Sequence, residues 1–216
     1  MTRERSTILP ALAAFAVFGA FWGAWGASIP RVRDQAGVSE AELGIALLCI
    51  GAGALPAMLL TGRLLDRVGV RLAGFVIAAL GIAGLAATLA AHSFVSLVLG
   101  LLAVGVASGA ADVAMNSVAG RAEQDAGRPV ITRAHGVLSA FVVIGSLVAG
   151  AVAAQDLPLE LPFAGIAAGA LAVGAWMLRV LPPATAHAAG GDVTRAGVHS
   201  AFVPLLLLGV LGALGF

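Results

Sequence analysis

Charged residues are scarce in this sequence, and tyrosine and lysine are absent from it. Of its 216 residues only 11% are charged while 60% are hydrophobic, and the mean hydropathy is +1.04. Charged residues make up about a quarter of an ordinary soluble domain, because its surface must face water. The scarcity of charge therefore excludes a soluble domain and predicts an all-α membrane protein that has lipid as its solvent.

Cysteine is almost missing as well, since Cys49 is the only one and lies within an apolar run. A single thiol excludes an internal disulfide and a thiolate metal site, so we expect no metal ion and no cofactor. The net charge of +1 provides no basic surface for nucleic acid. Because every basic residue is an arginine, the composition indicates a bacterium with a GC-rich genome.

Six hydrophobic stretches are each long enough to cross a hydrocarbon core of about 30 Å as a helix. We expect these helices at 8–29, 42–61, 72–91, 94–117, 131–154 and 161–181. The polar segments 30–41 and 120–129 are expected to be loops, and Ser39 has the position of an N-cap before the second helix. The sequence thus predicts a six-helix transmembrane bundle over 1–181.

The remainder of the sequence predicts a linker over 182–199, rich in alanine, glycine and proline, and a partial seventh helix over 200–216. From Ala201 to Phe216 a helix would be about 24 Å long, which is too short to span the membrane. A charged chain terminus in hydrocarbon is unfavourable. We therefore expect a piece of a longer protein; the alternative is a short protein that naturally ends here.

The arginines predict how the bundle is oriented. If the N-terminus is cytoplasmic, only Arg31 and Arg33 lie outside and every other arginine lies inside. Basic residues are retained on the cytoplasmic side of a membrane. We expect a multi-pass protein of the bacterial inner membrane with a cytoplasmic N-terminus.

Polar side chains within the spans are concentrated on the fourth and fifth helices. Ser108, Asp112 and Asn116 recur every four residues and therefore share one helix face. The fifth helix carries a second polar stripe that includes His135 and Ser139, together with Thr132 and Ser146. Stripes of this kind are expected to face a cavity or one another.

Asp112 is the principal candidate for function, because an intramembrane carboxylate is costly and usually has a role. It can bind a proton, a sodium ion or a polar solute; alternatively it pairs with Asn116, a backbone group or Arg121. His135 is a candidate proton carrier or solute ligand, and its alternative is a link between helix ends. Trp22 and Trp25 lie on one helix face and can stack on a sugar ring, or else anchor the helix at the interface.

Glycines spaced four residues apart indicate where helices approach one another closely. Such small-xxx-small pairs are expected to pack against neighbouring helices in a membrane. The pairs are Gly19 with Gly23, Gly105 with Gly109, and Gly165 with Gly169.

A short charged segment, 62–71, separates the second hydrophobic stretch from the third. Its pattern consists of Gly62, Asp66, Arg67, Gly69 and Arg71. This pattern resembles the signature loop between helices 2 and 3 of the major facilitator superfamily, a family of secondary transporters. The family usually has a basic residue where this sequence has Val70. The resemblance implies a gating loop at the cytoplasmic face.

The resemblance covers the whole chain, and segments 112–116, 127–129 and 134–136 look like a sugar-permease-like bacterial branch that is largely uncharacterised. It implies the N-terminal half of a facilitator fold, a 3+3 inverted repeat, followed by the start of helix 7. It further implies alternating-access transport of a small polar solute, sugar-like and coupled to protons. The implied partners are the bilayer, the solute, protons and the missing second half.

Without that second half, we do not expect the chain to transport by itself. The alternative function is a non-transporting half-transporter or a structural membrane subunit that needs a partner chain. An enzyme is not expected: segment 106–109 lacks the first glycine of the Gly-x-Ser-Gly motif of rhomboid proteases, and the sequence has no phosphate-binding loop.

Overall fold

A computed structural model describes residues 5–183 of the chain. This part of the chain folds into helices alone, which are α1 (Arg5–Ala36), α2 (Glu40–Val68), α3 (Leu72–Ala90), α4 (Phe94–Ala126), α5 (Ile131–Ala154) and α6 (Glu160–Val180). All six are long and apolar enough to cross a membrane. The predicted six-helix transmembrane bundle is confirmed, whereas the predicted linker beyond Pro183 and the predicted helix over 200–216 lie outside the described residues.

Three helices extend further than the hydropathy of the sequence predicted. The expected loops over 30–41 and 120–129 are largely helical, because α1 continues to Ala36 and α4 to Ala126, and α2 continues to Val68. Tertiary contacts hold the extension of α1: Val32 is buried, and the side-chain amide of Gln35 donates a hydrogen bond of 2.6 Å to the Thr88 carbonyl. Hydropathy detects only the part of a helix that lies in hydrocarbon, so it missed these ends.

The start of α2 agrees with its predicted N-cap. The Ser39 hydroxyl accepts a hydrogen bond from the Glu42 backbone N–H, and the Glu42 carboxylate accepts one from the Ser39 N–H at 2.8 Å. These reciprocal bonds form a capping box, which satisfies N–H groups that the helix itself leaves free.

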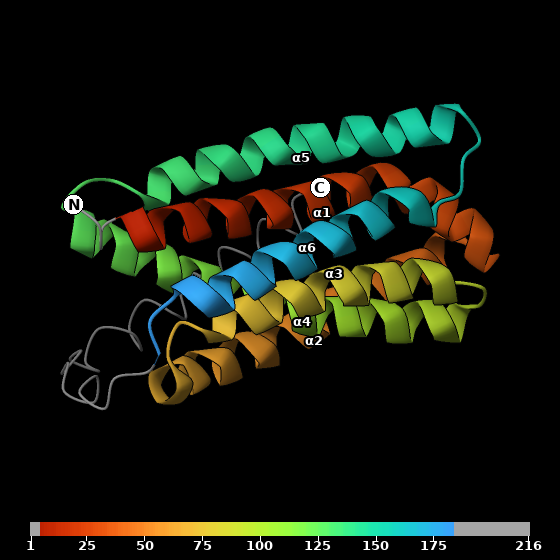
Figure 1. Cartoon of the computed structure of the whole chain (residues 1–216). Helices are drawn as coiled ribbons and strands as arrows, with labels where there is room; N and C mark the ends of the chain where they lie inside the picture. Colours follow the sequence, from red (N-terminus) through yellow and green to blue (C-terminus); the bar gives the residue numbers. More distant parts are fainter. Residues whose placement is uncertain (1–4, 184–216) are drawn as a thin grey trace, which may run out of the picture. The chain divides into compact units, whose positions relative to one another are not determined.

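The helices pack as three main pairs: α1 with α5, α2 with α4, and α3 with α6 (Figure 1). In addition α1 and α4 contact each other in the centre of the bundle. In such a repeat α1 corresponds to α4, α2 to α5, and α3 to α6. The α1–α5 pair then corresponds to the α4–α2 pair, and the α3–α6 pair corresponds to itself. The contacts therefore have the symmetry of an inverted repeat of three helices.

Glycines allow the closest of these approaches, at equivalent places in the two repeats. A Cβ atom on Gly19 or Gly23 of α1 would collide with the backbone of α5, and one on Gly105 or Gly109 of α4 would collide with the backbone of α2. Both pairs predicted from the sequence are thus confirmed as helix contacts. The prediction was wrong for the third pair, Gly165 and Gly169, where a Cβ would meet no atom within 4 Å.

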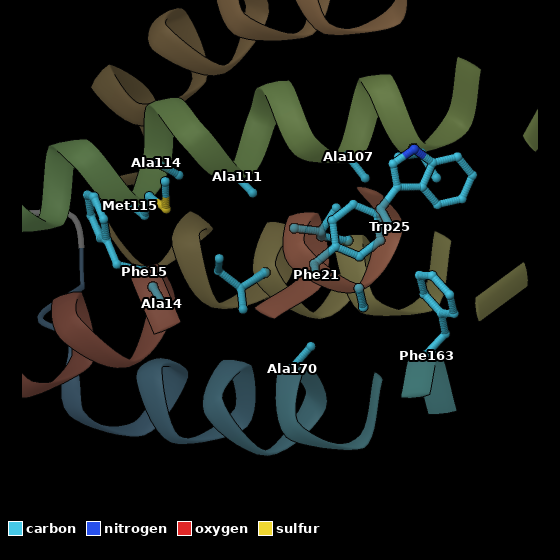
Figure 2. Packing of buried hydrophobic residues seen from close by; sticks show 14 of the residues in the cluster. Ala14, Phe15, Phe21, Trp25, Ala107, Ala111, Ala114, Met115, Phe163 and Ala170 are labelled. Carbon is cyan, nitrogen blue, oxygen red and sulfur yellow. The ribbon is translucent and has the colours of Figure 1, made fainter. Parts of the chain in front are cut away.

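The core lies between α1, α3, α4 and α6 (Figure 2). Small residues such as Ala14, Ala111 and Ala114 are fully buried there, and they allow α1 to pass close to α4. Phe163 of α6 and Met115 of α4 fill the space on either side and are 1% and 0% exposed. Central α1 and α4 are therefore fixed by packing, whereas α2 and α5 stay peripheral, with Leu48, Leu59 and Leu147 exposed by 75%, 71% and 68%.

Candidate functional site

A polar cluster forms where α4 faces the first turns of α5, and we call Asp112, Asn116 and His135 the polar cluster. The Asn116 side-chain amide donates hydrogen bonds to the Asp112 carbonyl at 2.9 Å and to the Asp112 carboxylate at 3.2 Å. Asp112 lies about 27 Å along α4 from the beginning of that helix, at Phe94. The four-residue spacing thus brings an amide and a carboxylate together at membrane depth, as expected from helix geometry.

His135 belongs to the cluster although it lies on a different helix. Its imidazole is exposed, and among residues 5–183 no hydrogen bond or ion pair joins it to Asp112. The ring of Phe15 from α1 meets it in a T-shaped contact, with ring centres 5.0 Å apart. His135 Nδ1 lies 3.0 Å from the Ile131 carbonyl of its own helix, to which it donates when Nδ1 carries the ring hydrogen.

The serines of the two predicted stripes do not join this cluster. Ser108 is 4% exposed, and its hydroxyl donates to the Gly105 carbonyl of its own helix at 3.2 Å. Ser139 is exposed on α5, one turn beyond His135. Ser146 donates across to the Gly23 carbonyl of α1 at 3.0 Å, which strengthens the α1–α5 pair. Of the residues in the two stripes, only Asp112 and Asn116 are joined to each other by a hydrogen bond.

The two tryptophans lie away from the polar cluster, in an aromatic group of α1 and α6. Trp25 is 3% exposed, stacks on Phe21 with ring centres 6.5 Å apart, and meets the edge of Phe163 (Figure 2). Trp22 is half-buried and packs edge-on against Phe21 at 5.3 Å. Within the described bundle Trp25 is therefore a core residue, because only 3% of it is exposed.

The segment predicted as a gating loop is mostly helix. Gly62, Asp66 and Arg67 lie on the last turns of α2, and only the short turn around Gly69 is non-helical, with a φ of 76° at that glycine. The prediction of a loop was wrong because Leu65, which is 8% exposed, holds the charged end of α2 against the bundle. Asp66 and Arg67 are exposed, and within residues 5–183 neither makes a side-chain hydrogen bond or ion pair.

Arg71 joins this turn to the end of α6. Its Nε donates a hydrogen bond of 2.8 Å to the Leu181 carbonyl, immediately after the last residue of α6. The last carbonyls of a helix have no partner within the helix, and they attract a positive charge. The family-like arginine therefore has a structural role here, because it fixes the start of α3 to the end of α6.

We expect Arg71→Ala to lower stability by about 1–2 kcal/mol, because a charge-assisted hydrogen bond at a helix end is lost. In detergent this corresponds to a fall in unfolding temperature of roughly 3–6 °C. Arg67→Ala is the matched control, since it removes an exposed arginine from the same segment. Equal shifts in the two variants would contradict the assigned role of Arg71.

One functional contact was missed from the sequence, where Glu123 was placed in a loop. Glu123 Oε2 accepts hydrogen bonds from the backbone N–H groups of Val130 and Ile131 at 2.8 and 3.0 Å. It thereby caps α5, whose own N-cap residue, Val130, makes no side-chain cap bond. One feature of the sequence could have predicted this cap: no Ser, Thr, Asp or Asn stands immediately before α5. The first N–H groups of α5 therefore need an acceptor from another part of the chain.

The polar cluster holds one carboxylate and one imidazole. Among residues 5–183 there is no group of three or more His, Cys, Asp or Glu side chains that could hold a metal ion.

Comparisons with known proteins agree with this architecture. A sequence model described as the Major Facilitator Superfamily matches residues 11–216. An uncharacterized transporter of Sinorhizobium fredii is 35% identical over 118 residues, which is 55% of this chain and 31% of that protein. An uncharacterized MFS-type transporter of Yersinia pestis is 34% identical over 118 residues, with the same coverage of 55% and 31%.

A third relative is the membrane protein MosC of Rhizobium meliloti, which is 31% identical over 125 residues, or 58% of this chain and 31% of that protein. The part of the chain that matches spans less than one third of the length of each of the three relatives, at 31%.

Proposed function

Because this chain belongs to the major facilitator superfamily, we propose that it forms one half of a secondary transporter that moves a small polar solute by alternating access. In such transporters two halves rock about a site near the middle of the membrane. The proposed membrane is the bacterial inner membrane, with the N-terminus in the cytoplasm. The distribution of arginines supports this orientation, because only Arg31 and Arg33 then lie outside.

The observation that carries the proposal is the polar cluster on α4 and α5. A carboxylate bonded to an amide is costly to maintain at membrane depth and indicates a function there. Asp112 and His135 can each take up and release a proton, so they are suited to couple the solute to protons. Asn116 and Ser139 are proposed to bind the hydroxyl groups of a sugar-like solute.

The proposed partner is a second six-helix half, either in the same polypeptide or in a separate chain. The exposed surfaces of α2 and α5 are rich in leucine, valine and isoleucine, for example Leu55 and Leu147, which are 67% and 68% exposed. Asp66, exposed at the end of α2, is proposed to bond to that second half in one state and to release it in the other.

The test is proton movement in liposomes that hold the assembled transporter and a trapped pH-sensitive dye. We expect one class of sugars or other small polar solutes to change the internal pH when added outside, and a protonophore to abolish the change. The 216-residue chain without its second half should give no such signal. Solute binding without any flux in the assembled protein would contradict transport and favour a non-transporting half-transporter.

A further inference from the structure

A completely buried aromatic ring from another helix supports the imidazole of His135. This ring is Phe15 of α1, which is 0% exposed and meets the imidazole in a T-shaped contact, at an interplanar angle of 66°. His135 itself is exposed on α5. The imidazole therefore rests against the protein on one side and stays accessible on another.

The Phe15 ring is held in place by the core around it. Phe15 belongs to the same buried cluster as Ala114 and Met115 of α4, which are both 0% exposed (Figure 2). A fully buried ring in a close-packed core has little room to change its rotamer. Phe15 is therefore a fixed surface for the side chain that packs against it.

The two helices are also fixed to each other about one turn beyond this contact. Gly19 lies one turn after Phe15 on α1, and Leu138 lies about one turn after His135 on α5. A Cβ atom on Gly19 would collide with the backbone of Leu138, because the two helix backbones touch there. Phe15 and His135 consequently stay in contact unless α1 and α5 separate.

The orientation in which the imidazole is held distinguishes its two nitrogens. Nδ1 lies 3.0 Å from the Ile131 carbonyl oxygen, one turn earlier on α5. A carbonyl oxygen only accepts hydrogen bonds, so this bond forms in the tautomer that has the hydrogen on Nδ1. In that tautomer Nε2 has a free lone pair, on the side of the ring away from Ile131. Nε2 would then accept a proton to give an imidazolium, and would return to the neutral ring on releasing it.

We propose that Phe15 is a positioning residue for His135. Its ring keeps the imidazole in the orientation in which Nδ1 donates to the Ile131 carbonyl, so that Nε2 is the nitrogen that binds and releases the transported proton. The role of Nε2 rests on the proposed function. The orientation of the ring does not, because the tautomer of a histidine is measured without transport.

The tautomer is measured by nitrogen-15 NMR on the full 216-residue chain in micelles, with labelled histidine and at an alkaline pH that keeps the ring neutral. The chemical shift of each ring nitrogen shows whether it carries a hydrogen. His135→Gln identifies the signals of His135 among those of the four histidines. We expect the hydrogen on Nδ1 in the unchanged protein, and a hydrogen predominantly on Nε2 would overturn the proposal.

Two matched variants test whether Phe15 sets this orientation. Phe15→Leu removes the ring, so the imidazole can turn away from Ile131, and we expect the hydrogen to move largely to Nε2, as in free histidine. Phe21→Leu removes an equally buried ring of the same helix, which packs on Trp25 and Phe163 instead, and it should leave the tautomer unchanged. An unchanged tautomer in Phe15→Leu, or an equal change in both variants, would overturn the proposal.

A further measurement needs no variant and so does not depend on how Phe15→Leu folds. Nuclear Overhauser contacts between the ring protons of Phe15 and His135 are expected, because the ring centres are 5.0 Å apart. Their absence would overturn the proposal.

Transport tests the role of Nε2 separately. In the assembled transporter Phe15→Leu should slow solute-driven proton movement by roughly tenfold, which is less than the loss expected on removing a proton-transferring group itself. A changed tautomer with an unchanged rate would contradict the role of Nε2. A changed tautomer in a protein that responds to no solute would support the positioning by Phe15 and contradict the proposed function instead.

Discussion

Asp112→Asn is expected to reduce the rate of solute-driven proton movement in the assembled transporter by roughly a hundredfold. A loss of this size is typical of removing a group that transfers protons. Asparagine has the shape of aspartate and can still contact Asn116, so packing is retained. The asparagine side chain cannot take up or release a proton in the physiological pH range. The proposed proton transfer through position 112 would therefore stop. The measurement is the change of internal pH in liposomes when solute is added.

The control for this variant is Asp156→Asn. Asp156 is exposed at the turn between α5 and α6, with a φ of 51° that asparagine also tolerates. Asp156→Asn removes one negative charge, as Asp112→Asn does, but at an exposed turn. The coupling of solute to protons should therefore be unchanged. Normal coupling in Asp112→Asn, with normal expression, would show that Asp112 has no role in proton transfer.

Gly23→Ala is expected to destabilise the bundle by about 1–3 kcal/mol, although alanine favours a helix more than glycine does. The added methyl group would collide with the backbone of Val142, because α1 and α5 touch at this point. The Ser146 hydroxyl bond to the Gly23 carbonyl, 3.0 Å long, would be strained by the same displacement. Equilibrium unfolding in mixed micelles measures the effect.

Gly26→Ala is the matched comparison, one turn further along the same helix. A Cβ there would meet no atom within 4 Å, so alanine should stabilise the protein by about 0.5–1 kcal/mol. The repeat-related variant Gly109→Ala should resemble Gly23→Ala, since its Cβ would approach the Ala54 backbone of α2. A stabilising effect of Gly23→Ala would contradict the close approach of α1 to α5.

Hydropathy predicted the number and order of the helices in the described bundle, and it predicted α5, at 131–154, without error. It succeeded for α5 because polar residues begin where that helix ends. It failed for α1, α2 and α4 because these helices leave the hydrocarbon and continue with charged residues. Their extra turns depend on contacts such as the Arg31 bond of 2.6 Å to the Leu157 carbonyl, which no local pattern reveals.

The candidate site was predictable only where its contacts lie within one helix. Asp112 and Asn116 were joined by their spacing, whereas their relation to His135 depends on how α4 and α5 pack. The same limit explains Trp25, since no local pattern predicts that Phe163 of α6 packs against it. Gly165 resembled a packing glycine for the same reason, and the structure shows open space instead.

The carboxylate that caps α5 has a mechanical consequence. Glu123 belongs to α4, and it holds the first N–H groups of α5 at 2.8 and 3.0 Å, one turn before His135. These two bonds tie the first turn of α5 to the last turn of α4, so Glu123→Ala would leave two N–H groups at the start of α5 without their acceptor.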